Sequence, residues 1–269
     1  MDNEAVPLRR GVVRKFFSTL AQQGPLVTAK RVNEYMQEHC AKIHGVGRIF
    51  LWTDGLINAV QRYLDSSFDR KYGVDTSGVI PLKNLTIESD YKDEGIWYEP
   101  MSVKIFHQIM RNLEIDFTKF DFIDFGSGKG RVLLLASDYG FKKVIGVEFA
   151  QELHRIAGKN AAIYSLYNRK PNNIETICID AINFSLPDSP LVGFFYSPFR
   201  KKVMEKVLEK FSMSLNLNPR KIIFIFYGLN PDTIDTIKSS NFQWKELEVR
   251  SDWTRGTQYK CFLFTNPSS

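Results

Sequence analysis

The sequence predicts a doubly wound α/β fold: a seven-stranded sheet that closes with a C-terminal antiparallel hairpin and is preceded by a helical N-terminal extension. Three observations predict it. Short apolar runs alternate with helical stretches from residue 101 onward, the first run ends in a glycine-rich turn, and a polar segment joins the last two runs. Such alternation is typical of a parallel sheet with helices on both faces.

The first 90 residues differ from the rest of the chain. Between residues 8 and 72, apolar residues recur at helical spacing, as at Val12, Phe16 and Leu20. Residues 71–95 then hold enough Gly, Pro, Ser and Asp to interrupt any helix, which predicts a loop or short-strand connector. We therefore predict two domains: a helical extension with its connector over 1–90, acting as a lid that shapes the substrate pocket, and an α/β domain over 91–269.

The elements of the α/β domain follow from their apolar patterns. The helix expected over 102–113 has Ile105, Phe106, Ile109, Met110 and Leu113 on one face. Helices over 131–140 and 201–211 follow the first and fourth strands. The polar segment 250–257 is expected to join the last two strands as a hairpin. The predicted strands are 120–125, 142–149, 174–180, 191–197, 220–228, 242–249 and 258–265.

Composition restricts the class of protein. With 269 residues and 43% hydrophobic content, the chain can fill a sizeable core. It has no long apolar run, and its acidic start "MDNEAVP" lacks the layout of a secretory signal. The three cysteines have no paired spacing, which favours a reduced compartment. These features predict a cytoplasmic protein without a membrane partner.

The charged and metal-ligating residues give weaker signals. The net charge of +6 permits an anionic partner, but Lys and Arg are spread along the chain, so nucleic acid remains an alternative. His39, Cys40 and His44 lie close together without a distant pair of ligands, and we predict no metal site.

The stretch "DFGSGKGR", residues 124–131, carries the main functional signal. Its glycines, Gly126, Gly128 and Gly130, lie between a strand and a helix, where positive φ lets a ligand approach the bare backbone. The dinucleotide fingerprint is G-x-G-x-x-G, whereas this spacing is G-x-G-x-G. Asp124 would repel a pyrophosphate but attract an amino group. The turn thus favours a ligand with an ammonium end and disfavours a nicotinamide-dependent oxidoreductase.

Two further acids end the next strands. Glu148 is placed to accept hydrogen bonds from both hydroxyls of a ribose. Asp180, one strand later, is placed to accept one from an adenine amino group. Either acid alone is weak evidence, because acids often cap helices. Together, the amine, ribose and adenine sites describe S-adenosylmethionine.

Residues 98–200 resemble class I S-adenosylmethionine-dependent methyltransferases through "FIDFGSGKGR", "VIGVEF", "CIDA" and "FFYSPF". A longer similarity, from "FDRKYGVDTSG" through "YEP" to "LNPRKIIFIFYGLNP", suggests a little-characterised microbial methyltransferase family with the same helical preamble. The resemblance implies a Rossmann-like sheet and S-adenosyl-L-methionine as cofactor. It further implies that the methionine end contacts Asp124, Gly126, Ser127, Gly128 and Gly130, the ribose Glu148, and the adenine Phe149, Asp180 and Ala181, with Tyr98 and Glu99 over the cofactor.

The segment after the fourth strand, Tyr196, Ser197, Pro198 and Phe199, is the candidate catalytic turn. Related enzymes that methylate amine or planar amide nitrogens have an Asn/Asp/Ser-Pro-Pro-aromatic turn there. This chain lacks the second proline and has Ser where the microbial family commonly has Asn. A purely structural turn that ends the strand is therefore as well supported as a catalytic turn. We predict methyl transfer to a nitrogen, with oxygen less favoured, of a protein side chain or small metabolite. The alternatives are an RNA or DNA methyltransferase and a catalytically silent cofactor-binding partner subunit.

Overall fold

The computed structural model describes residues 66–87, 89–95, 97–168, 173–229, 231–238, 242–249 and 259–266. The chain divides into two compact units, and every described residue belongs to the unit that contains the sheet. The predicted helices before residue 66, the cluster at His39, Cys40 and His44, and the hairpin loop 250–257 lie outside the described residues. The predicted domain boundary at residue 90 stays a prediction.

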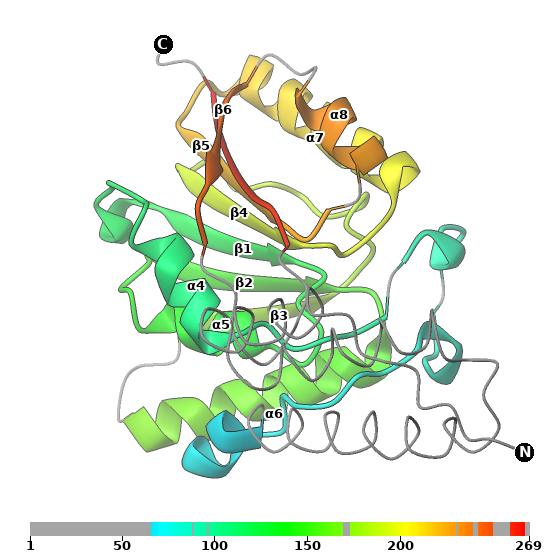
Figure 1. Cartoon of the computed structure of the whole chain (residues 1–269), viewed down its shortest axis with the longest axis vertical. Helices are drawn as coiled ribbons and strands as arrows, with labels where there is room; N and C mark the ends of the chain where they lie inside the picture. Colours follow the sequence, from blue (N-terminus) through cyan, green and yellow to red (C-terminus); the bar gives the residue numbers. More distant parts are fainter. Residues whose placement is uncertain are drawn as a thin grey trace, which may run out of the picture. The chain divides into compact units, whose positions relative to one another are not determined.

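The seven strands form one sheet in the order β3-β2-β1-β4-β5-β7-β6 (Figure 1). β1 to β5 run parallel, and β7 is antiparallel to both β5 and β6. This arrangement confirms the predicted Rossmann-like sheet with a C-terminal antiparallel hairpin. The strands are β1 (Asp121–Phe125), β2 (Lys143–Glu148), β3 (Ile174–Cys178), β4 (Leu191–Tyr196), β5 (Ile222–Tyr227), β6 (Gln243–Leu247) and β7 (Cys261–Thr265).

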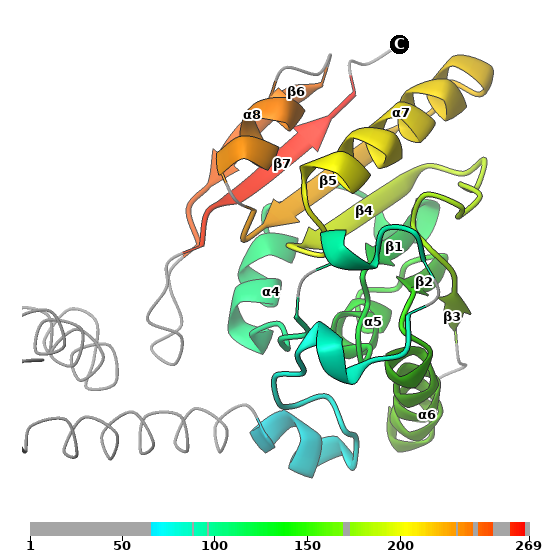
Figure 2. The same ribbon diagram turned by 90° about the vertical axis from the view of Figure 1, so that its right-hand side faces the viewer.

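Helices cover both faces of the sheet. α4 (Val103–Met110), α5 (Arg131–Ser137) and α6 (Gln151–Asn168) lie on one face, and α7 (Lys201–Leu217) and α8 (Pro231–Lys238) on the other (Figures 1 and 2). Alternate residues of β1 serve the two cores: Phe122 belongs to the core under α4 and α5, and Ile123 to the core under α7. No helix in the described part of the chain is long and apolar enough to cross a membrane.

The core helps to hold the carboxyl ends of the central strands. Phe125, Phe195 and Phe226 stack across β1, β4 and β5, with ring centroids 4.7 Å apart in each pair. Stacked aromatic pairs add about 0.5–1.5 kcal/mol each beyond their buried area. The strand ends from which the turns after β1 and β4 begin are therefore held in place by aromatic packing.

The connector before the sheet contacts the same end of the strands. After a helical stretch over 66–72, it contains two short 3₁₀ helices, η1 (Leu82–Asn84) and η2 (Lys92–Glu94). Isolated bridges pair Ile80 with Tyr98 and Gly95 with Phe199. A third 3₁₀ helix, η3 (Phe117–Lys119), leads into β1. The predicted loop with short-strand character is confirmed over the described part of 73–95, whereas residues 71 and 72 belong to the helical stretch.

Candidate active site

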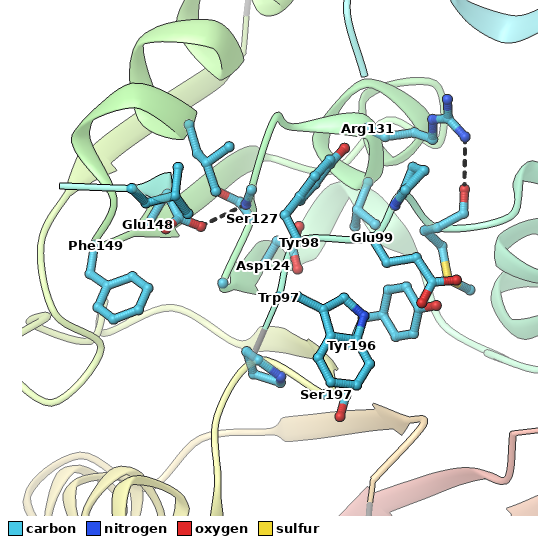
Figure 3. A pocket seen from close by; sticks show the side chains of 18 of the residues that line it. Trp97, Tyr98, Glu99, Asp124, Ser127, Arg131, Glu148, Phe149, Tyr196 and Ser197 are labelled. Carbon is cyan, nitrogen blue, oxygen red and sulfur yellow. Dashed lines mark hydrogen bonds between the residues drawn. The ribbon is translucent and has the colours of Figure 1, made fainter. Parts of the chain in front are cut away.

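The central strands create a crevice at their carboxyl ends. β1 pairs with β2 on one side and with β4 on the other. The glycine turn after β1 leads into α5 on one face, whereas the Ser-Pro-Phe turn after β4 leads into α7 on the opposite face. Such a reversal of strand order opens a crevice in which α/β proteins bind ligands. Figure 3 shows the side chains that gather there.

Three adjoining cavities occupy this crevice, and we name them by their position. The first is the glycine-turn cavity, lined among others by Tyr98, Glu99, Asp124, Gly126, Ser127, Gly128, Glu148, Phe149, Tyr196, Ser197 and Pro198. The second, the β3-side cavity, includes Asp180, Ala181 and Phe199 and shares Gly126, Phe149 and Pro198 with the first. The third, the outer cavity, has a volume of about 700 Å³ and shares Leu82, Trp97, Glu99, Tyr196 and Ser197 with the first.

The structure therefore brings together all but one of the residues that the sequence analysis selected. The exception is Gly130, which faces α6: a Cβ atom there would lie 3.1 Å from the Cβ of Ala157. Gly130 has a φ of 85° and caps the start of α5. Its position fits a role in helix packing and turn geometry.

The other two glycines of the turn lie under side chains from distant segments. Gly126 has a φ of 81° and Gly128 a φ of 55°. A Cβ on Gly126 would lie 2.5 Å from the Cβ of Pro198, and a Cβ on Gly128 would overlap the ring of Tyr98. The bare backbone is thus needed for the approach of protein side chains, beside any role it has toward a ligand.

We expect Gly128→Ala to lower the free energy of unfolding by about 2–3 kcal/mol, since it combines left-handed strain of about 1–2 kcal/mol with a clash against Tyr98. Gly140→Ala is the matched control, because Gly140 has a φ of 78° and, its chain neighbours aside, no atom of the described residues lies within 4 Å of its Cβ position. Urea unfolding measures both variants. Equal losses would show that the Tyr98 contact contributes nothing, whereas Tyr98→Ala in the Gly128→Ala background should recover part of the loss.

Two buried carboxylates face the glycine-turn cavity. Glu148 accepts hydrogen bonds from the backbone N–H groups of Gly128 and Ala150, both at 2.8 Å. Burial raises the pKa of Glu148 to about 7, although these N–H groups oppose the rise. Burial, and then the neighbouring Glu148, raise the pKa of Asp124 well above its ordinary value. A cationic ligand would relieve the repulsion between them.

The raised pKa of Glu148 predicts a pH dependence of stability. Because its pKa rises from 4.5 in the unfolded chain to about 7 in the folded protein, its contribution is complete below pH 4.5 and is lost as the pH rises through 7. The loss amounts to about 3 kcal/mol. Urea unfolding between pH 4 and 8 should show a weaker decline for Glu148→Gln than for the wild type, because the amide does not titrate. Parallel curves would contradict the assignment.

Ser127 carries a polar atom that lacks a partner. Its Oγ is buried and has no hydrogen-bond partner among the described residues, and Ser127 lines the same cavity as Asp124 and Glu148. A buried hydroxyl without a partner is costly, so such groups often mark a ligand contact. A ligand with an amino-acid end and ribose hydroxyls fits this set of a hydroxyl and two acids.

In the β3-side cavity, the acid Asp180 is hydrogen-bonded to side-chain and backbone groups of the neighbouring loops. Asp180 accepts hydrogen bonds from the Ser89 hydroxyl at 2.6 Å and from the Ile182 N–H at 3.0 Å. Its carboxylate thus also stabilises the local turn after β3. The Phe149 ring, on the wall shared with the glycine-turn cavity, packs against the backbone of Gly95, where a Cβ would lie 2.8 Å away.

A buried polar network lies behind the glycine turn. Arg131 is 3% exposed; its Nε donates to the Thr76 hydroxyl at 2.7 Å, and its Nη2 lies 3.5 Å from Asp69. The Tyr98 hydroxyl donates to the Thr76 carbonyl at 2.6 Å. The network therefore ties residues 69–77 to both the turn and the ring above it. Its signal in the sequence was the polar stretch "GVDTSG", which ordinary loops also show.

Lys129 joins the same network from within the glycine turn. Its ammonium donates to Asp75 at 2.7 Å and to the Ser77 carbonyl at 2.9 Å. Asn160 on α6 bridges the two segments, since its amide donates to the carbonyls of both Asp75 and Lys129. The acid beside Lys129, Asp75, thus comes from the connector, and the acid beside Arg131, Asp69, comes from the helical stretch that precedes it.

The turn after β4 is strained. Ser197 has a φ of 42° and is the one non-glycine residue with positive φ in the described part of the chain. It also precedes a proline, which disfavours helical backbone angles at that position. Strain of this kind persists where the surroundings impose it, and it is concentrated at functional sites. This observation favours a functional role for the Ser-Pro-Phe turn.

No family model and no curated protein matches the chain. It is similar to the crystal structure of ribosomal protein L11 methylase from Lactobacillus delbrueckii subsp. bulgaricus, with 18% identity, a TM-score of 0.42 and coverage of 61% of this chain and 77% of that chain. It is also similar to an RNA methyltransferase from Salinibacter ruber in complex with S-adenosyl-L-homocysteine, with 16% identity, a TM-score of 0.44 and coverage of 63% and 95%. Likenesses at this level decide neither the reaction nor the acceptor. The fold that the resemblance to class I methyltransferases implies is present in the strand order itself.

Proposed function

We propose that the chain is an S-adenosylmethionine-dependent methyltransferase that acts on a nitrogen, or less favourably an oxygen, of a protein side chain or small metabolite. The observation that carries the proposal is the pair of buried acids, Asp124 and Glu148, beside the Ser127 hydroxyl, which has no hydrogen-bond partner in the described part of the chain. When bound, S-adenosylmethionine supplies a methyl carbon on a sulfonium sulfur, and the sulfur keeps the electron pair when that bond breaks.

The residues of the glycine-turn cavity would hold the amino-acid end of this cofactor. Asp124 would accept from the ammonium group, and the Ser127 hydroxyl would gain its missing partner. Glu148 would accept from both ribose hydroxyls, since each carboxylate oxygen can accept a further hydrogen bond. The backbone of Gly126 and Gly128 would border the ligand beside Pro198 and Tyr98, which occupy the space that side chains on these glycines would need, and Gly130 sets the turn.

The adenine would lie toward the β3-side cavity. There Phe149 offers a ring for stacking, and Asp180 with Ala181 lines the far wall. Tyr98 would cover the cofactor on the side of Gly128, and the hydrogen bond from its hydroxyl to the Thr76 carbonyl would hold its ring in that position. Glu99 follows Tyr98 and lies at the opening toward the outer cavity.

The turn after β4 would position the acceptor. Tyr196, Ser197 and Pro198 line the glycine-turn cavity, and Tyr196 and Ser197 also line the outer cavity. Phe199 is buried behind them and pairs with Gly95. Methyl transfer is an in-line displacement, so holding an acceptor nitrogen in line supplies much of the catalysis. The strained Ser197 would do this.

Calorimetric titration with S-adenosylmethionine, S-adenosylhomocysteine and NAD tests the proposal. We expect the first two to bind and NAD not to bind. Binding of NAD alone would overturn the cofactor assignment. Methyl transfer to any acceptor would exclude a catalytically silent subunit, and transfer to an oligonucleotide, with binding that weakens steeply as salt rises, would favour the nucleic-acid alternative.

A further inference from the structure

The outer cavity lies where a methyl acceptor must approach. It has a volume of about 700 Å³ and adjoins the glycine-turn cavity at Trp97, Glu99, Tyr196 and Ser197, which line both. A molecule in the outer cavity therefore reaches the strained turn from the side opposite Glu148 and Phe149 (Figure 3). What this cavity recognises depends on its walls and its charges.

Three aromatic side chains, those of Trp97, Tyr196 and Tyr259, line the outer cavity. Trp97 is 56% exposed although it lines a cavity. The ring of Tyr196 lies 5.2 Å from that of Tyr227 and 6.2 Å from that of Tyr259. It also packs on Gly228, whose Cβ position is 3.3 Å from the ring. Ring faces held in this way attract cations through their quadrupoles, and tryptophan does so most strongly.

The charged side chains of the outer cavity are unevenly placed. Among its lining residues the charged groups are Glu99 and Arg200. Glu99 also lines the glycine-turn cavity, so its negative charge lies at the inner end, whereas Arg200 lines the outer cavity alone and is exposed. This order of charges draws the cationic end of an acceptor inward, toward the reacting turn.

We infer that the outer cavity binds an aliphatic amine, with Glu99 accepting hydrogen bonds from its nitrogen and with Trp97 and Tyr196 flanking its cationic end. This inference rests on the proposed function and gives Glu99 a second role beside the predicted cofactor contact. A phosphate at the inner end of the cavity would be repelled by Glu99, although Arg200 would attract one at the outer end, and a neutral alcohol or nucleobase would gain no cation–π attraction.

Methyl transfer to the bound amine requires the release of one proton from its ammonium form. The bound ammonium gives up one proton to water, which frees the nitrogen lone pair. That lone pair bonds to the methyl carbon while the carbon–sulfur bond breaks and its electrons stay on sulfur. The product leaves as an N-methylammonium ion. Glu99 lowers the cost of placing the cationic product in the cavity.

Tryptophan fluorescence with butylamine and butan-1-ol as matched probes tests the inference, in the presence of S-adenosylhomocysteine. Butylamine should quench the emission, Trp97→Phe should abolish that quenching, and butan-1-ol should not quench at the same concentration. Glu99→Gln should weaken butylamine binding about tenfold more than it weakens S-adenosylhomocysteine binding. Glu205→Gln, which removes an exposed carboxylate of α7 that lines none of these cavities, is the control.

Equal binding of the alcohol and the amine, or no selective effect of Glu99→Gln, would overturn the inference. Failure of S-adenosylhomocysteine to bind the wild type would instead overturn the proposed function, so the two failures are distinguishable. Transfer assays then separate the sources of the amine: a lysine-containing peptide represents a protein acceptor and butylamine a small one. Transfer to an oligonucleotide and to neither amine would also overturn the inference.

Discussion

Replacing Glu148 with alanine is expected to raise the dissociation constant of S-adenosylhomocysteine about a hundredfold or more. Two hydrogen bonds from ribose hydroxyls to a carboxylate are worth about 1.5–3 kcal/mol each when the acceptor is charged. The variant also leaves the buried N–H of Gly128 without the acceptor that it has at 2.8 Å. Calorimetric titration at pH 8, above the raised pKa of Glu148, measures the effect.

Glu175→Ala is the matched control for that experiment. Glu175 lies on β3, is exposed, and lines none of the three cavities. Its loss should leave the affinity unchanged. If Glu148→Ala binds S-adenosylhomocysteine as the wild type does, the ribose contact is wrong. A folded variant, shown by an unchanged far-ultraviolet circular dichroism spectrum, is needed for either conclusion.

Replacing Asp69 with alanine is expected to lower the free energy of unfolding by about 3–5 kcal/mol. Asp69 accepts hydrogen bonds from the Thr76 hydroxyl at 2.5 Å and from the N–H groups of Thr76 and Ser77 at 2.8 and 2.7 Å. Its loss leaves these donors, and the Arg131 guanidinium with its 2% exposed side chain, without that carboxylate. Uncompensated buried charge is the main cost. Urea denaturation measures the loss.

Glu205→Ala is the control for Asp69→Ala. Glu205 pairs with Lys201 at 3.7 Å on the surface of α7, with both side chains about half exposed. Exposed pairs of this kind contribute about 0–1 kcal/mol because water screens them. A loss for Asp69→Ala as small as that for Glu205→Ala would show that the network behind the glycine turn does not stabilise the fold.

Much of the fold was predictable from the sequence because buried strands and helices need apolar residues at spacings that a short stretch of sequence shows. A strand covered on both faces needs a short apolar run, and the runs at β4 and β5 are almost uninterrupted. A helix on one face needs apolar residues at its own period, and the predicted face of α4, from Ile105 to Met110, is buried. The expected antiparallel pairing of β6 and β7 is likewise confirmed.

The placement of the candidate site was predictable for a related reason. Parallel strands end at one edge, so Asp124, Glu148 and Asp180, each at or near a strand end, had to lie in neighbouring positions. The glycine spacing marked a turn with positive φ, and all three glycines have it. These features depend on strand order and local geometry, both of which the sequence pattern carries. Whether the residues bind the cofactor stays a prediction.

The contacts that shape the site were decided by the tertiary structure. Tyr98 lies over Gly128 and Pro198 lies against Gly126, while Asp69 meets Arg131 from 62 positions away. The outer cavity combines Trp97 with Tyr259, which are further apart still. By itself, the sequence determined which segments are buried strands and helices and which turn needs glycine, because those properties depend on near neighbours. The partners of Tyr98, Asp69 and Trp97 depend on how a long connector packs across the sheet, and no local pattern encodes that packing.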